Sequence, residues 1–180
     1  MTDAELAALA AAGDGDAFGT LVERYAPAVR RVTRSLLRDP EDADDAAQEG
    51  LLSAWRHIGR YDPTRPFGPW LMRIALNAAQ DLRRRRRVRE TDPIPYDASS
   101  PGEGPDLATE RILLRARLDR ALSALPPRQR VAVVLFDAEG YSHAEVAEVL
   151  GIPEGTVRSD VFHGRRALRV HLAPASDEVT

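Results

Sequence analysis

The sequence predicts an all-α fold of two small helical domains joined by an acidic linker. Apolar residues recur at helical spacing through most of the 180 residues, and no segment alternates convincingly as a half-buried strand does. Residues 91–106 hold four prolines, two glycines and several acidic residues, a composition that cannot build a core. We therefore expect domains at 1–90 and 111–173, a flexible linker at 91–110 and a frayed tail at 174–180.

The first domain begins with an Ala/Leu-rich helix that ends at a Gly-Asp-Gly turn. Asp16 is suited to cap a second helix, and Asp39 followed by Pro40 marks the start of a third. Three prolines between 59 and 69 predict a loop before a fourth helix. The expected helices cover residues 3–12, 16–36, 39–58 and 70–87.

The second domain carries the sharpest local pattern, over residues 142–170. Ser142 and Glu145 have the spacing of a capping box, and Gly151 can take a positive φ at the end of that helix. A second helix follows at once, so the segment has the pattern of a helix-turn-helix. Its helices are expected at 107–124, 127–138, 143–150 and 154–171.

The second helix of such a motif presents its N-terminal residues to base edges in the major groove. The candidates for that face are Thr156, Arg158, Ser159, Phe162 and His163, and Arg165, Arg166 and Arg169 are better placed for phosphates. An ordinary helical hairpin with solubilising arginines is the alternative. The capping box, turn and arginine placement together favour DNA binding.

Residues 125–159 resemble region 4 of the extracytoplasmic-function (ECF) sigma factors of RNA polymerase. The resemblance implies that this domain recognises the minus-35 promoter element. Asp160 and His163 stand where the family usually has arginine. Asp160 is expected either to accept a hydrogen bond from a cytosine amino group or to turn away and pair with Arg158 or Arg165.

Residues 43–55 and 67–83 resemble region 2 of the same family, which docks on the clamp helices of the polymerase β′ subunit and holds the melted minus-10 element. In the third predicted helix, Ala47, Leu51, Trp55 and Ile58 can face the core. Gly50 stands where the family prefers a larger residue, so we expect it to loosen this helix slightly. The residues expected to bind polymerase are Asp42, Asp45, Gln48, Glu49 and Leu52.

Promoter melting needs a pocket for a flipped base and a basic track for the displaced strand. Trp70 has two interpretations, core packing or base stacking, and core packing is favoured because Leu71 and Ile74 need a partner. The residues expected to bind the minus-10 element are Arg60, Tyr61, Arg65, Phe67, Arg73, Asn77, Arg83 and Arg84, within an arginine run that extends to Arg87.

Charge is arranged in blocks although the formal net charge is only -3. Residues 61–89 hold eight arginines against two acidic residues, and residues 90–110 hold six acidic residues and no arginine. Such blocks indicate separate surfaces for separate partners, with the basic ones suited to phosphates. Solvated helix faces are the alternative for any single block.

The sequence thus predicts a non-enzymatic transcription initiation factor that binds core RNA polymerase and directs it to promoters through the minus-10 and minus-35 elements. By resemblance, its partners are the β′ clamp helices, the β flap, promoter DNA and an anti-sigma protein. No cofactor, metal site or membrane contact is expected, since cysteine is absent and the four histidines lack ligand spacing. The expected location is cytoplasmic. The main alternative is a stand-alone helix-turn-helix regulator, which leaves residues 43–55 and 67–83 unexplained.

Overall fold

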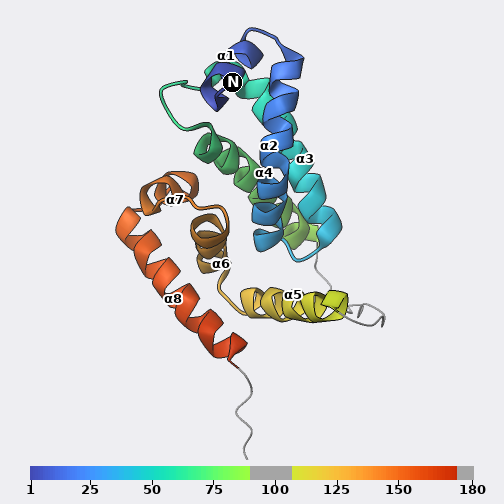
Figure 1. The fold of residues 1–180 in the computed structure, drawn as a ribbon, viewed down its shortest axis with the longest axis vertical. Coiled ribbons are helices and arrows are strands. Elements are labelled where there is room, and N and C mark those ends of the chain that lie inside the picture. The colour runs from blue at the N-terminus through green and yellow to red at the C-terminus, as the bar shows by residue number, and fades with distance from the viewer. Residues whose placement is uncertain (90–106, 174–180) are drawn as a thin grey trace, which may run out of the picture.

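The computed structural model describes residues 1–89 and 107–173, and the regular elements in these two ranges are all helical (Figure 1). This confirms the predicted all-α class. In chain order the elements are α1 (Asp3–Ala11), α2 (Gly15–Leu36), α3 (Pro40–His57), the 3-10 turn η1 (Ile58–Arg60), α4 (Phe67–Arg89), α5 (Leu107–Ser123), α6 (Pro127–Val133), the π-helical turn η2 (Val134–Ala138), α7 (His143–Leu150) and α8 (Glu154–Leu172).

Local capping signals set most of the helix starts. The Asp39 side chain accepts from the backbone N–H of Asp42 at 3.0 Å, as predicted for the start of α3. The predicted cap of α2 is wrong by two residues, because Asp14 rather than Asp16 accepts the free backbone N–H groups of the first turn. α4 starts three residues earlier than predicted and takes Pro69 into its first turn, where a proline removes no hydrogen bond.

The first domain is a bundle in which α2, α3 and α4 pack on one another and α1 lies across one end (Figure 1). Its centre is filled by fully buried side chains. They include Leu21, Val29, Val32, Leu71, Met72 and Leu76. α3 and α4 run in opposite directions, so the start of α3 lies beside the end of α4.

The second domain is built from α5 to α8. α6 and α8 pack closely and bury Val131, Val157 and Val161, and α7 packs against α8 and η2. A Cβ built on the buried Gly164 of α8 would lie 2.6 Å from a methyl group of Val133, so this crossing depends on a small residue.

The two domains are in direct contact. α6 and η2 lie against α2, and α7 lies against α4 (Figure 1). The buried apolar residues of both domains form one continuous cluster. Within the two described ranges, none of the helices combines the length and apolar character needed to cross a lipid bilayer.

Candidate functional site

The outward face of α3 carries four of the five residues predicted to bind polymerase. Asp45, Gln48, Glu49 and Leu52 are all exposed, and the Leu52 side chain is 48% exposed despite being apolar. Leu52 lies one helical turn from the exposed Trp55, and contiguous exposed apolar surface marks interaction sites. This face is therefore a candidate protein-binding surface.

Asp42 does not belong to that face, and its predicted place there is wrong. It is 6% exposed and forms an ion pair with Arg86 at the far end of α4. Burial raises the pKa of the Asp42 carboxyl above its usual value, although Arg86 opposes the shift. The antiparallel packing of α3 on α4 turns this position inward, which helical spacing within α3 alone does not reveal.

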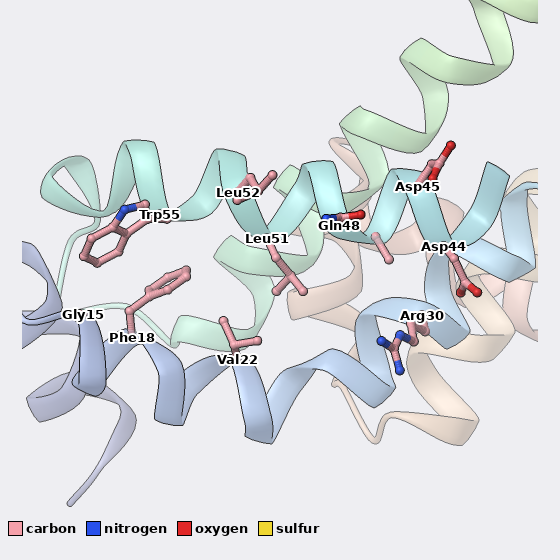
Figure 2. A pocket seen from close by; sticks show the side chains of 11 residues that line it. Gly15, Phe18, Val22, Arg30, Asp44, Asp45, Gln48, Leu51, Leu52 and Trp55 are labelled. Carbon is pink, nitrogen blue, oxygen red and sulfur yellow. The ribbon is translucent and has the colours of Figure 1, made fainter. Parts of the chain in front are cut away.

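A groove of about 640 Å³ lies between α2 and α3, beside the exposed face of α3 (Figure 2). Phe18 and Trp55 meet at one end with their ring centroids 4.9 Å apart, and Arg30 and Asp44 lie at the other. Trp55 is 36% exposed, so its predicted core position is wrong: it covers Phe18 at the rim of the bundle. The groove offers apolar contact at one end and charge at the other.

A second groove, of about 740 Å³, runs between α3 and α4. It brings together Arg60 and Asn77, two residues predicted to bind the minus-10 element, with Trp70 on the wall. Its α3 wall includes the exposed residues Asp45, Gln48, Glu49 and Leu52, so the two surfaces adjoin. Trp70 is half-buried and packs against Tyr61 and Phe67, so it combines core packing with a surface on the groove.

Arg85, which belongs to the predicted arginine run, also lines this second groove, and so does His57, which sequence reasoning missed. Nδ1 of His57 lies 2.7 Å from the carbonyl oxygen of Ser53 and donates to it, which fixes the orientation of the ring. Helical spacing was the available signal for His57, since it lies three residues before Arg60.

Phe67 supports the loop over 61–66 from inside and lines neither of the two grooves. It is 3% exposed, and its ring lies 5.4 Å from Tyr25 and 5.4 Å from Tyr61, centroid to centroid. Its predicted contact with DNA is therefore wrong. The hydroxyl of Tyr61, a half-buried residue, donates to the carbonyl of Arg65 at 2.5 Å, which ties the loop together.

The basic track of α4 is partly neutralised by neighbouring carboxylates. Arg84 pairs with Asp81 and Arg86 pairs with Asp42, whereas Arg73 on the same helix is exposed and Arg83 is half-buried. Arg65, before the helix, pairs with Glu148 of the second domain at 2.6 Å. The arginines predicted to follow phosphates are thus not equally available.

The helix-turn-helix forms as predicted. The side chains of Ser142 and Glu145 satisfy each other's backbone donors at the start of α7, and Gly151 ends that helix with φ of 66°. α8 then buries Val157, Val161 and Gly164 against the domain. The opposite side of α8 exposes Arg158, Ser159, Phe162, His163, Arg165 and Arg166, while Thr156 is half-buried.

Three charged side chains of α8 already have protein partners. Arg158 pairs with Glu154 at 2.6 Å, and Arg165 pairs with Asp137 and lies over the Phe136 ring, 5.0 Å from its centroid. Asp160 is 4% exposed and accepts from Nε of Arg128 at 2.6 Å. Neither predicted role of Asp160 is correct: it is too buried to reach a base, and its partner is on α6 rather than α8.

Two family profiles match the chain. Sigma-70 region 2 matches residues 21–89, and Sigma-70, region 4 matches residues 115–168. The chain is 39% identical to the ECF RNA polymerase sigma factor SigM of Mycobacterium tuberculosis, over 93% of this chain and 83% of SigM. It is 31% identical to the ECF RNA polymerase sigma factor SigW of Bacillus subtilis, over 89% and 91% of the two chains.

Two solved structures resemble the whole fold. CnrH, in complex with the cytosolic domain of CnrY, has a TM-score of 0.71 and 33% identity over 93% of this chain and 95% of its own. The sigma factor RpoE from Bartonella quintana, in complex with the anti-sigma factor NepR, has a TM-score of 0.69 and 27% identity over 86% and 96%. The chain belongs to the ECF sigma factors of RNA polymerase, within the sigma-70 family.

Proposed function

We propose that this chain brings core RNA polymerase to promoters, with its first domain reading the minus-10 element and its second reading the minus-35 element. The observation that carries the proposal is the presence, in one chain, of an exposed acidic and apolar face on α3 and an exposed recognition face on α8. The role is binding and positioning, so no bond-making step is assigned to any side chain.

Polymerase docking is assigned to Asp45, Gln48, Glu49 and Leu52, with Asp42 now left out. The partner is the β′ clamp helices, a basic coiled coil. Carboxylates suit its basic side chains, and Leu52 together with the α2–α3 groove offers apolar surface for its hydrophobic residues. The groove is continuous with the docking face, because Asp45, Gln48 and Leu52 belong to both.

Minus-10 recognition is assigned to the α3–α4 groove. A flipped base needs an apolar surface and hydrogen-bonding groups, which Trp70 and Asn77 supply. Arg60, Arg73, Arg83, Arg84 and Arg85 are suited to the phosphates of the displaced strand, and His57 is added to the set. Tyr61 and Phe67 hold the loop and are not assigned direct DNA contacts.

Minus-35 recognition is assigned to α8. Ser159, Phe162 and His163 lie on its exposed side near the N-terminus, where a recognition helix meets base edges. Arg158 and Thr156 flank them, and Arg165 and Arg166 are suited to phosphates. The ion pairs of Arg158 and Arg165 must open, or be shared, when DNA binds.

An anti-sigma protein and the β flap of polymerase are further proposed partners. CnrH and the Bartonella RpoE, which the chain resembles over most of its length, were each solved with a protein bound, NepR being an anti-sigma factor. The exposed leucines of α5 and the α2–α3 groove leave apolar surface available for such partners.

The test is pull-down of the purified protein with bacterial core RNA polymerase, followed by run-off transcription across a genomic promoter library. Stable binding together with transcription from a distinct promoter set is the expected result. Direct binding of duplex DNA without any binding to polymerase would favour the stand-alone regulator instead.

A further inference from the structure

Arg165 of α8 is held from two sides by the turn η2, which lies just before the helix-turn-helix. Its Nε donates to both carboxylate oxygens of Asp137, at 2.9 and 3.1 Å, and its Nη2 pairs with the same carboxylate. Its guanidinium also lies over the ring of Phe136, 5.0 Å from the centroid. We propose, resting on the function proposed above, that Phe136 and Asp137 form a cradle that holds Arg165 in the orientation in which it binds one phosphate of the minus-35 element.

The cradle leaves one edge of the Arg165 guanidinium free. A guanidinium carries five N–H donors in a planar fork, and the Asp137 carboxylate occupies Nε and one hydrogen of Nη2. The two hydrogens of Nη1 and the remaining one of Nη2 point away from Asp137, along an edge that arginine uses for two-point contact with a phosphate. The Arg165 side chain is 47% exposed, so a phosphate can reach this edge.

The π-helical geometry of η2 brings Phe136 and Asp137 to this place. Across the turn the N–H of Glu139 donates to the carbonyl of Val134 at 3.1 Å, five residues back instead of the four of an α-helix. Val134 and Leu135 are buried, whereas the two residues that follow them contact Arg165 on α8. Single π-helical turns are frequent at functional sites, and this one sets the side chains that hold an exposed arginine.

The Phe136 ring is itself fixed by the first helix of the helix-turn-helix. The ring of His143, the first residue of α7, stacks on it with the ring centroids 4.2 Å apart and the planes at 25°. Phe136 and His143 are both half-buried, so neither ring is free to turn in solvent. The cradle therefore joins the turn after α6, the start of α7 and the recognition helix α8 at one point.

A carboxylate beside a phosphate contact can orient the arginine or compete with the phosphate for it, and the geometry favours orientation. A free arginine loses side-chain conformational entropy when DNA fixes it, and the cradle has already imposed much of that loss in the folded protein. The Asp137 side chain is 34% exposed, so water and salt screen its repulsion of a nearby phosphate. Asp137 is thus a positioning residue that acts on DNA through Arg165.

The cradle is tested by a double-mutant cycle on promoter binding by the full chain together with core polymerase. Asp137→Asn keeps the shape of the side chain and removes its charge. We expect it to raise the dissociation constant about three- to tenfold, equally for all minus-35 sequences, and to have no effect when Arg165→Ala is already present. Phe136→Leu should behave in the same way, because it keeps an apolar side chain but loses the aromatic face.

Arg166→Ala is the matched control background. Arg166 is the next residue along α8, is exposed and has no ion pair with another residue in the described ranges 1–89 and 107–173. Asp137→Asn should therefore weaken promoter binding by the same factor in the Arg166→Ala background as in the original protein. Thermal melts of all the variants measure their stability alongside their binding.

A neutral methylphosphonate, placed at each phosphate of the minus-35 element in turn, gives the second readout. One position should weaken binding of the original protein and leave binding of Arg165→Ala unchanged. The effect at that position should also be smaller for Asp137→Asn than for the original protein. A merely structural role of Asp137 would not produce this dependence on a single phosphate.

Three results would overturn the cradle while leaving the proposed function in place. They are tighter promoter binding by Asp137→Asn, which would show that the carboxylate competes with DNA, an equal effect of Asp137→Asn with and without Arg165, and a loss of binding that only follows a lowered melting temperature. Absence of promoter binding by the original protein with core polymerase would overturn the proposed function, and the cradle with it.

Discussion

Gly50 in α3 lies directly against Ala75 in α4, where a Cβ on the glycine would lie 2.8 Å from the Ala75 Cα. Gly50 therefore does not simply loosen its helix, as its propensity suggests. It allows α3 and α4 to approach closely, and these two helices carry the docking face and both walls of the minus-10 groove.

Gly50→Ala should lower the free energy of unfolding by about 1–3 kcal/mol, because the new methyl group meets backbone that cannot easily move. Urea denaturation followed by circular dichroism measures the change. Gly19→Ala in α2 is the matched control: a Cβ there meets nothing within 4 Å, so helix propensity should stabilise the protein by up to about 1 kcal/mol. Equal changes in the free energy of unfolding for Gly50→Ala and Gly19→Ala would contradict the close approach of α3 and α4.

Asp45→Arg should weaken binding to core polymerase while leaving the melting temperature unchanged. The side chain is exposed on α3, so reversing its charge disturbs a docking contact and no internal one. Pull-down at two salt concentrations and a thermal melt give the two readouts. Unchanged affinity would remove Asp45 from the docking face.

Asp42 should affect stability rather than docking, and its effect should depend on pH. Burial raises the pKa of Asp42 in the folded state, so ionising this carboxyl costs the fold free energy. Protonated Asp42 stabilises the fold fully at pH values below the pKa that this carboxyl has in the unfolded chain. That contribution is lost as the pH rises through the pKa of the same carboxyl in the folded protein. Asp42→Asn should therefore gain stability relative to the original protein as the pH rises through the titration of this carboxyl. Denaturation of both proteins across that pH range checks the direction of the stability change. A loss of stability in Asp42→Asn with rising pH would show that the ion pair with Arg86 outweighs the effect of burial.

Asp160→Ala should lower the melting temperature without changing base preference at a single promoter position. The carboxylate is buried against Arg128 at 2.6 and 3.2 Å, and its removal leaves a cavity and an unpaired donor. Thermal melting measures the effect of the substitution on stability, and duplex binding across minus-35 variants measures its effect on base preference. A loss confined to one base position would restore Asp160 as a base reader.

Arg158→Ala should cost about 1–3 kcal/mol of promoter binding and relax preference at one base position if Arg158 reads a base edge. Glu154→Gln should instead strengthen promoter binding, because it releases Arg158 from its ion pair within α8. Affinity is measured on a set of minus-35 variants with polymerase present. A uniform loss over all sequences would make Arg158 a phosphate contact.

Short-range signals in the sequence determined the helices and the helix-turn-helix. Asp39 with Pro40, the Ser142–Glu145 capping box and Gly151 each act within a few residues, so the chain pattern is sufficient to predict them. The exposed faces of α3 and α8 could also be predicted from helical spacing. The exceptions are positions whose burial depends on another helix. The family resemblance added which domain is expected to read which promoter element, and helical spacing alone does not contain that information.

Only the tertiary structure decided what lies opposite each face. Asp42, Trp55, Phe67 and Asp160 were each misplaced because their environment comes from a helix distant in sequence. The contact between the domains has the same origin: Tyr141 meets Gly68 only once two separate bundles are packed together. Local propensities fix where helices begin and end, but burial and pairing of charges depend on distances that only the packed fold defines.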